Sequence, residues 1–131
     1  MIETFDAHVC AVNEEKDLNV FIVALAERAD SPTQYVELQR SIEQDEQDIA
    51  LGIDTYCVIT SYGATNYGGI TSCILFNDIL TIEFTKEAEA KLGIQAYRIS
   101  LILSDPDKGL LKSGLTRLFH QDKSPPKKLI L

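Results

Sequence analysis

The sequence lacks the features that mark membrane and secreted proteins. No apolar run is longer than Val20–Ala26, which is far too short to span a bilayer. The amino-terminal segment carries acidic residues where a signal peptide has its basic region. The three cysteines, Cys10, Cys57 and Cys73, are odd in number and lie in apolar patterns, so we expect small buried residues rather than a disulfide framework. These absences predict a cytoplasmic protein.

Recognisable sites for chemistry are also scarce. His8 and His120 are far apart, and neither has a metal-ligand spacing with a cysteine or carboxylate. No serine lies in a nucleophile elbow, and no cysteine has a neighbouring base that would activate it. The run Tyr67-Gly68-Gly69 lacks the lysine and the helix start of a phosphate-binding loop. We therefore expect no catalytic residue, no cofactor and no metal.

Basic residues are rare in the first part of the chain. Residues 1–54 contain 13 acids and 3 bases, a net charge of −10, whereas residues 55–131 contain 7 acids and 9 bases, a net charge of +2; the sum is −8. An acidic surface repels nucleic acids and anionic membranes and attracts basic proteins, although it also serves solubility alone. Four carboxylates lie within six residues, and desolvation keeps such a run on the surface: Glu43, Asp45, Glu46 and Asp48. The charge pattern therefore favours a protein partner.

The hydrophobic patterns of the first two-thirds of the chain predict strands. Residues 54–84 predict three strands in succession, with a hairpin loop at 61–66 and a tight turn at Asn77-Asp78. Gly68-Gly69 inside the second of these strands indicates a bulge or a close backbone approach. Earlier strands are expected over residues 5–12, 20–25 and 35–42; the last also fits a helical stripe, but its Val, Tyr and Ile residues favour a strand. Residues 20–25 are apolar on both faces, as in a strand that is covered on both sides.

A helix, a strand and a second helix are expected to follow. Thr85 is a suitable N-cap and Gly93 a suitable C-terminal left-handed residue for the first helix. The strand covers residues 97–103, and Asp105-Pro106 opens the second helix, with Asp105 as its cap. Residues 121–131 form a basic, proline-containing tail that we expect to be loosely attached. The predicted α+β fold is one domain over residues 1–120, a mostly antiparallel sheet of about six strands with two helices packed on one face.

Around residues 54–84 the sequence also carries a set of short motifs. They are Leu51-Gly52, Asp54-Thr55-Tyr56, Gly63, Thr65, Tyr67-Gly68-Gly69 and Leu80-Thr81, continued by Thr85, Glu87-Ala88, Leu92-Gly93 and Thr116-Arg117-Leu118-Phe119. In these residues the chain resembles the immunity protein 10 family of bacterial polymorphic toxin systems, over roughly residues 43–119. The resemblance implies a small cytoplasmic protein without catalytic residues that binds and neutralises a toxin domain. It brings no established binding residues with it.

The resemblance and the charge pattern lead to one hypothesis about the binding surface. Its residues are the four carboxylates Glu43, Asp45, Glu46 and Asp48, with Tyr62 at the hairpin tip as an aromatic anchor. Two other interpretations stay open. One is a small-molecule or nucleotide-binding module with Tyr56, Tyr67 and Gly69 around a pocket, and the other is a subunit of a homo-oligomer that pairs through a strand edge. An enzyme is the interpretation with the least support.

Overall fold

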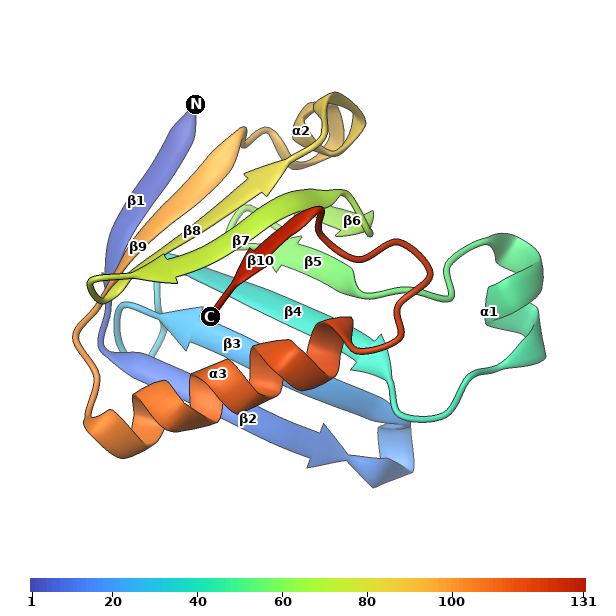
Figure 1. Ribbon diagram of the computed structural model, residues 1–131, viewed down its shortest axis with the longest axis horizontal. Helices are drawn as coiled ribbons and strands as arrows, with labels where there is room; N and C mark the ends of the chain where they lie inside the picture. Colours follow the sequence, from blue (N-terminus) through green and yellow to red (C-terminus); the bar gives the residue numbers. More distant parts are fainter.

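The computed structural model describes all residues from Met1 to Leu131 and contains two five-stranded sheets (Figure 1). Sheet A has the order β1 (Ile2–Ala7), β9 (Ala96–Leu101), β8 (Ile79–Phe84), β7 (Ile70–Phe76) and β10 (Lys128–Ile130). Sheet B has the order β2 (Val9–Glu15), β3 (Val20–Ala26), β4 (Tyr35–Ser41), β5 (Cys57–Thr60) and β6 (Thr65–Tyr67). The helices are the 3-10 helix η1 (Lys16–Leu18), α1 (Glu46–Leu51), α2 (Lys86–Leu92) and α3 (Asp105–Phe119).

The α+β class is confirmed, but its strands are divided between two sheets instead of one. Within the sheets, only β1 with β9 and β10 with β7 pair in parallel, and all other neighbours are antiparallel. The mostly antiparallel character is therefore also confirmed. The strand expected over residues 35–42 is β4, and the tight turn at Asn77 and Asp78 joins β7 to β8 with φ values of 50° and 60°.

The chain crosses between the sheets at two points where a single strand was expected. Residues 5–12 are broken at His8, where β1 ends in sheet A and β2 begins in sheet B. Gly68 and Gly69 make the second crossing, from β6 to β7, with φ values of 72° and 89°. The close backbone approach expected there is confirmed, because a Cβ on Gly69 would lie 2.6 Å from the Cβ of Ala88 in α2.

The hydrophobic core lies between the sheets, and α3 closes one side of it. Figure 1 shows α3 in front of β2 and β3 and below β10. Gly114 lets α3 approach the inner face of sheet B, because a Cβ there would lie 3.1 Å from methyl groups of Val12 and Val23. The buried face of α3 consists of Leu111, Gly114, Leu115, Leu118 and Phe119. None of the helices is long and apolar enough to cross a membrane.

The helices depart from the predicted arrangement in two ways. They do not share one face: α3 contacts the inner side of sheet B, α2 contacts β6, and α1 projects from one end of the molecule (Figure 1). The cap of α3 is Ser104, whose Oγ accepts from the backbone N–H of Asp107 at 3.3 Å, so Asp105 is the first helical residue rather than the cap.

Two segments of the chain lie differently from expectation. Residues 49–52 include three apolar residues, a composition that favours burial, but they end α1, where Ile49 is 50% exposed and Leu51 63% exposed. Residues 121–131, expected as a loose tail, place β10 beside β7 in sheet A and bury Asp122. Neither arrangement has a periodic sequence signal, because both segments are short and held by residues distant in sequence.

Candidate interaction surface

The four carboxylates singled out in the sequence lie on and just before α1. Asp45 is the N-cap of this helix and its side chain accepts from the backbone N–H of Gln47 at 2.8 Å. Glu46 and Asp48 follow in the first turn, where negative charge is favourable to the helix dipole. Gly52 ends the helix in the left-handed conformation, at φ 75°. The acidic run is therefore the start of a helix. The sequence could have indicated this, because Asp45 is a suitable N-cap, acids follow in the first turn and Gly52 is a suitable C-cap.

A second acidic segment is tied to the first by Asn19, which follows η1. Its side-chain amide donates to the carbonyl of Glu43 at 2.9 Å, and its Oδ1 accepts from the backbone N–H of Glu43 at 2.8 Å. The pair of bonds fixes the β2–β3 connection beside the β4–α1 connection. We call the resulting surface the acidic end; its carboxylates are Glu15, Asp17, Glu43, Asp45, Glu46 and Asp48.

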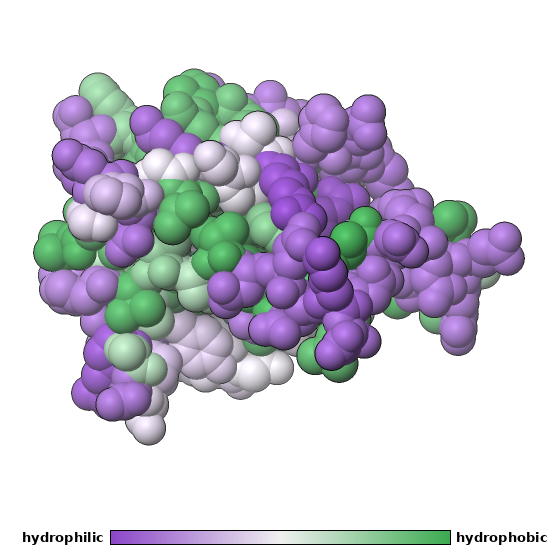
Figure 2. All heavy atoms as spheres, turned by 90° about the horizontal axis from the view of Figure 1, so that it is seen from below, coloured by the Kyte–Doolittle hydropathy of each residue, from purple (hydrophilic) through white to green (hydrophobic).

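None of the carboxylates of the acidic end forms a salt bridge. The four ion pairs of the molecule use Glu14, Asp54, Asp78 and Asp122 instead. Three large apolar side chains are exposed among the acids: Leu18, Ile49 and Leu51. Figure 2 shows the molecule from below, coloured by hydropathy. Hydrophilic residues predominate at the right-hand end, where α1 lies, and hydrophobic residues gather toward the middle and left.

A buried polar cluster holds the base of α1 against the segment that follows α3. Asp122, fully buried, accepts from the Thr55 hydroxyl at 2.8 Å and lies 3.4 Å from the Arg40 guanidinium. Lys123 donates to the carbonyl of Gly52 at 3.1 Å and to Asp54 Oδ1 at 2.5 Å. The hydrogen bond from Lys123 lowers the pKa of Asp54 below its usual value. The segment between α1 and β5 is therefore bonded to the segment after α3 at two neighbouring places, through Asp122 and through Lys123.

Tyr62 lies away from the acidic end. It is 64% exposed on the β5–β6 hairpin, at the opposite end of β5 from α1, and its hydroxyl donates to Glu3 of β1 at 3.0 Å. This hydrogen bond to a carboxylate, with the charge of Glu3, raises the pKa of Tyr62. The structure therefore brings the four carboxylates together but does not bring Tyr62 to them.

The residues of the small-molecule interpretation do not converge on one pocket. Tyr56 is fully buried, stacks edge-to-face on Phe119, and accepts a hydrogen bond from the backbone N–H of Ile70 at 2.8 Å. Burial raises its pKa to about 12, which keeps the phenol neutral. An open hollow of about 380 Å³ is lined by Tyr67 and Gly69, but Tyr56 is not part of its wall.

The titratable groups offer little for covalent or metal chemistry. All three cysteines are free, and burial raises the thiol pKa of Cys10 and Cys57 to about 11, so these thiols are protonated at neutral pH. No three His, Cys, Asp or Glu side chains are placed so that they could hold a metal ion. What the described surface offers instead is charge and exposed apolar area.

Comparison with known families gives one match. The family model described as immunity protein 10 matches residues 6–108, from β1 to the first turn of α3. This range begins in the last two residues of β1 and includes all of sheet B and most of the region in which the sequence motifs lie. No curated protein matches the chain. Because the family model covers well over half of the sequence, the chain belongs to the immunity protein 10 family.

Proposed function

We propose that this protein binds a toxin domain of a polymorphic toxin system directly and neutralises it by covering a basic surface of that domain. The observation that carries the proposal is the acidic end, where six carboxylates project without a basic partner in a chain of an immunity protein family. The protein contributes a complementary surface and no bond-making step.

The arrangement of the charges supports binding over solubility alone. Solubility is served by charges of both signs that are interspersed, whereas like charges held together repel one another and cost stability. A concentrated negative field instead draws in a basic surface and raises the rate of encounter by roughly ten- to a thousandfold at low salt. The exposed side chains Leu18, Ile49 and Leu51 then supply apolar contacts that hold the partners together after encounter.

The direct test uses the C-terminal domain of the protein encoded immediately upstream of this gene. Expressed alone in a bacterial host, that domain should stop growth, and co-expression of this chain should restore it. The two proteins should also form a stoichiometric complex in calorimetry. If this chain neither restores growth nor binds that domain, the proposal is wrong.

A further inference from the structure

We propose that the toxin domain adds an extended segment to the free edge of β2 in sheet B, and that lysine or arginine residues of this segment lie beside Glu15 and Asp17 of the acidic end. This inference rests on the proposed function and locates its interface. In strand addition of this kind, the backbone hydrogen bonds of an edge strand hold the segment, and neighbouring side chains select it.

The backbone of β2 offers hydrogen-bonding groups on the side away from β3. β2 is the outermost strand of sheet B and pairs with β3 over all seven of its residues (Figure 1). Just beyond β3, the Glu27 N–H donates to the Gln34 carbonyl, so the odd-numbered positions of β3 bond to β4 and the even-numbered ones to β2. Those even-numbered positions lie opposite odd-numbered residues of β2. The N–H and C=O groups of Cys10, Val12 and Glu14 therefore point outward from the edge of the sheet.

α3 packs against the inner face of β2 and leaves these backbone groups free. The methyl groups of Val12 lie 3.1 and 3.2 Å from the Cβ position of Gly114, and Glu14 forms an ion pair with Arg117 of α3. Both contacts are made by side chains, which stand across the sheet rather than along its edge. No backbone group in a loop or turn forms a hydrogen bond with residues 9–15. The edge of β2 is therefore covered by no other part of the chain.

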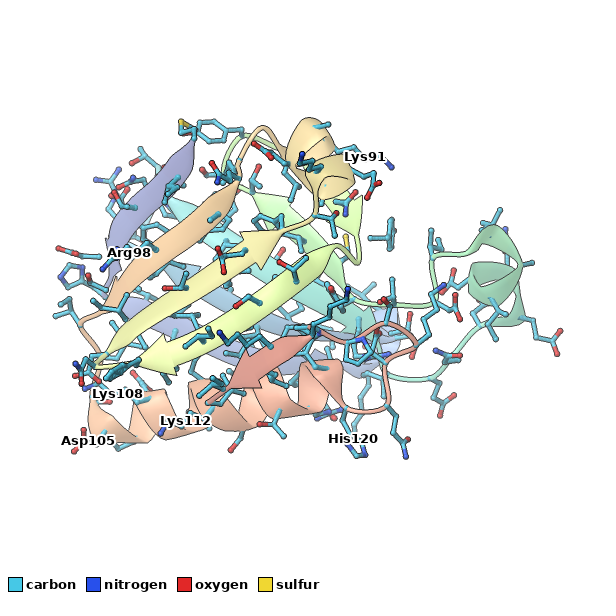
Figure 3. All side chains as sticks on the ribbon, turned by 45° about the horizontal axis from the view of Figure 1, so that its top comes forward. Lys91, Arg98, Asp105, Lys108, Lys112 and His120 are labelled. Atoms are coloured by element: carbon cyan, nitrogen blue, oxygen red, sulfur yellow. The ribbon has the colours of Figure 1, made fainter.

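The other three edge strands carry features that normally prevent strand addition. β10, the short pale red arrow at the edge of sheet A in Figure 3, has three residues and follows Pro125-Pro126 and Lys127. β6 also has three residues, ends before Gly68-Gly69 and contacts α2. On β1, the carbonyl of Thr4 accepts from the side-chain amide of Gln34 at 3.1 Å, so its edge is partly covered. β2 is the longest of the four and contains no proline, lysine or arginine, so it is the edge that remains available.

The side chains of β2 change character along the strand, toward the acidic end. Residues 9–12 are apolar and half-buried, whereas residues 13–15 are polar and exposed. η1 follows directly and carries Asp17, and neither Asp17 nor Glu15 forms an ion pair. A segment laid along β2 therefore meets apolar side chains first and unpaired carboxylates last. A segment with apolar residues that ends in lysine or arginine complements both parts.

The position of the charges favours a basic partner over a second copy of this chain. Two identical edge strands related by a two-fold axis run antiparallel, so Glu15 of one copy lies toward the start of β2 in the other. Residues 1–15 contain no lysine or arginine, so the second copy supplies no such cation there. The Lys16 residues of the two copies lie at opposite ends of the pair. A basic segment of a toxin domain supplies the cations that a second copy lacks.

The first test measures amide hydrogen exchange in the wild-type chain, alone and bound to the upstream-encoded C-terminal domain. The N–H groups of Cys10, Val12 and Glu14 should exchange at least about tenfold more slowly in the complex, because they then bond to the added strand. The N–H groups of Ala11 and Asn13 bond to β3 and should be protected in both states. Exchange in β10 should not change. If binding leaves exchange at Cys10, Val12 and Glu14 unchanged, the docking edge is wrong.

The second test compares Glu14→Pro with Glu14→Gln. Both variants lose the carboxylate and its ion pair with Arg117, but only proline also removes the outward N–H. Proline is compatible with an edge strand where the N–H faces solvent, so we expect both variants to fold. In calorimetric titrations with the same domain, Glu14→Pro should bind at least about tenfold more weakly than Glu14→Gln. Equal affinities of two folded variants would contradict the inference, and the exchange test decides if the proline variant does not fold.

The outcomes separate the inference from the function on which it rests. If the wild-type chain neither binds that domain nor protects against it, the proposed function fails. If the wild-type chain binds without added protection along β2, the function stands and the docking edge is wrong. Sedimentation of the chain alone as a dimer that Glu14→Pro dissociates would also overturn the inference, because the edge would then be occupied by a second copy.

Discussion

Gly69 lies where the chain passes from sheet B to sheet A, and two separate physical effects require glycine there. Its φ of 89° is strained for any residue with a Cβ. A Cβ would also lie 2.6 Å from the Cβ of Ala88 and 2.8 Å from the side-chain nitrogen of Asn66. The backbone of Thr85 donates to the carbonyl of Gly69 at 2.8 Å, so the crossing is also bonded to the start of α2.

Gly69→Ala should therefore destabilise the fold by more than the backbone strain of a positive φ would alone. We expect a loss of roughly 2–5 kcal/mol in the free energy of unfolding, the sum of a left-handed backbone and an overpacked contact. Gly63→Ala is the matched control, because Gly63 has φ 81° but nothing within 4 Å of its Cβ position, and it should cost only about 1–2 kcal/mol. Urea unfolding measures both. Equal losses would show that the contact with α2 contributes nothing.

At this scale the sequence is informative wherever the chemistry is local. The Thr85 cap, the left-handed Gly93 and the Asn77-Asp78 turn depend on a residue and its neighbours, and all three are found as predicted. Tyr62 is exposed as expected, but its hydrogen-bond partner Glu3 comes from a strand far away in sequence. No local pattern predicts such a contact.

Among the elements, α1 depends on a distant segment for its position. Asp122, which follows α3, accepts hydrogen bonds from Thr55 and from the backbone N–H of Ser124, and it faces the guanidinium of Arg40. Arg40 also donates to the carbonyl of Leu118, near the end of α3. The end of α3, the strand β4 and the chain that leaves α1 therefore meet at one buried carboxylate.

Replacing this carboxylate should loosen α1 together with the fold. Asp122→Ala leaves Arg40 and Thr55 without their partner, and removal of one member of a buried ion pair costs about 3–5 kcal/mol. Urea unfolding should show this loss, and amide exchange should speed up in residues 46–57. Lys123→Ala is the control, because its ion pair with Asp54 faces solvent, and its effect should be much smaller. If the two variants are equally stable, the buried cluster does not anchor α1.

The division into elements was predictable only where periodicity is strong. The alternation of β4 and β8 and the helical stripe of α3 identified these elements from the sequence. The six residues of α1 and the three of β10 are too short for such a signal. The division into two sheets depends on the breaks at His8 and Gly68-Gly69, and nothing near them says which sheet the next strand joins. For the same reason, the sequence of β3, which is apolar on both faces, predicts a strand covered on both sides. In the structure only one face of β3 is fully buried.

The molecule as a whole separates its charge by position. The acidic end carries carboxylates that form no ion pair, whereas the four ion pairs of the molecule use other carboxylates. The sequence alone identified the acidic run at residues 43–48. Only the hydrogen bonds between Asn19 and Glu43 show that Glu15 and Asp17 lie beside this run. In the proposed function, the negative field governs the rate of encounter with the toxin domain, and the exposed side chains Leu18, Ile49 and Leu51 govern how long the complex lasts.

The most direct test of the central claim is the association rate with the upstream-encoded toxin domain as a function of salt concentration. The double reversal Asp45→Lys with Glu46→Lys should slow association at low salt by roughly tenfold or more and flatten its salt dependence. The control Asp6→Lys with Glu83→Lys makes the same change in net charge on the outer face of sheet A and should have a much smaller effect. Equal slowing by both pairs would mean that net charge alone acts, and an unchanged rate in the first pair would remove the acidic end from the interface.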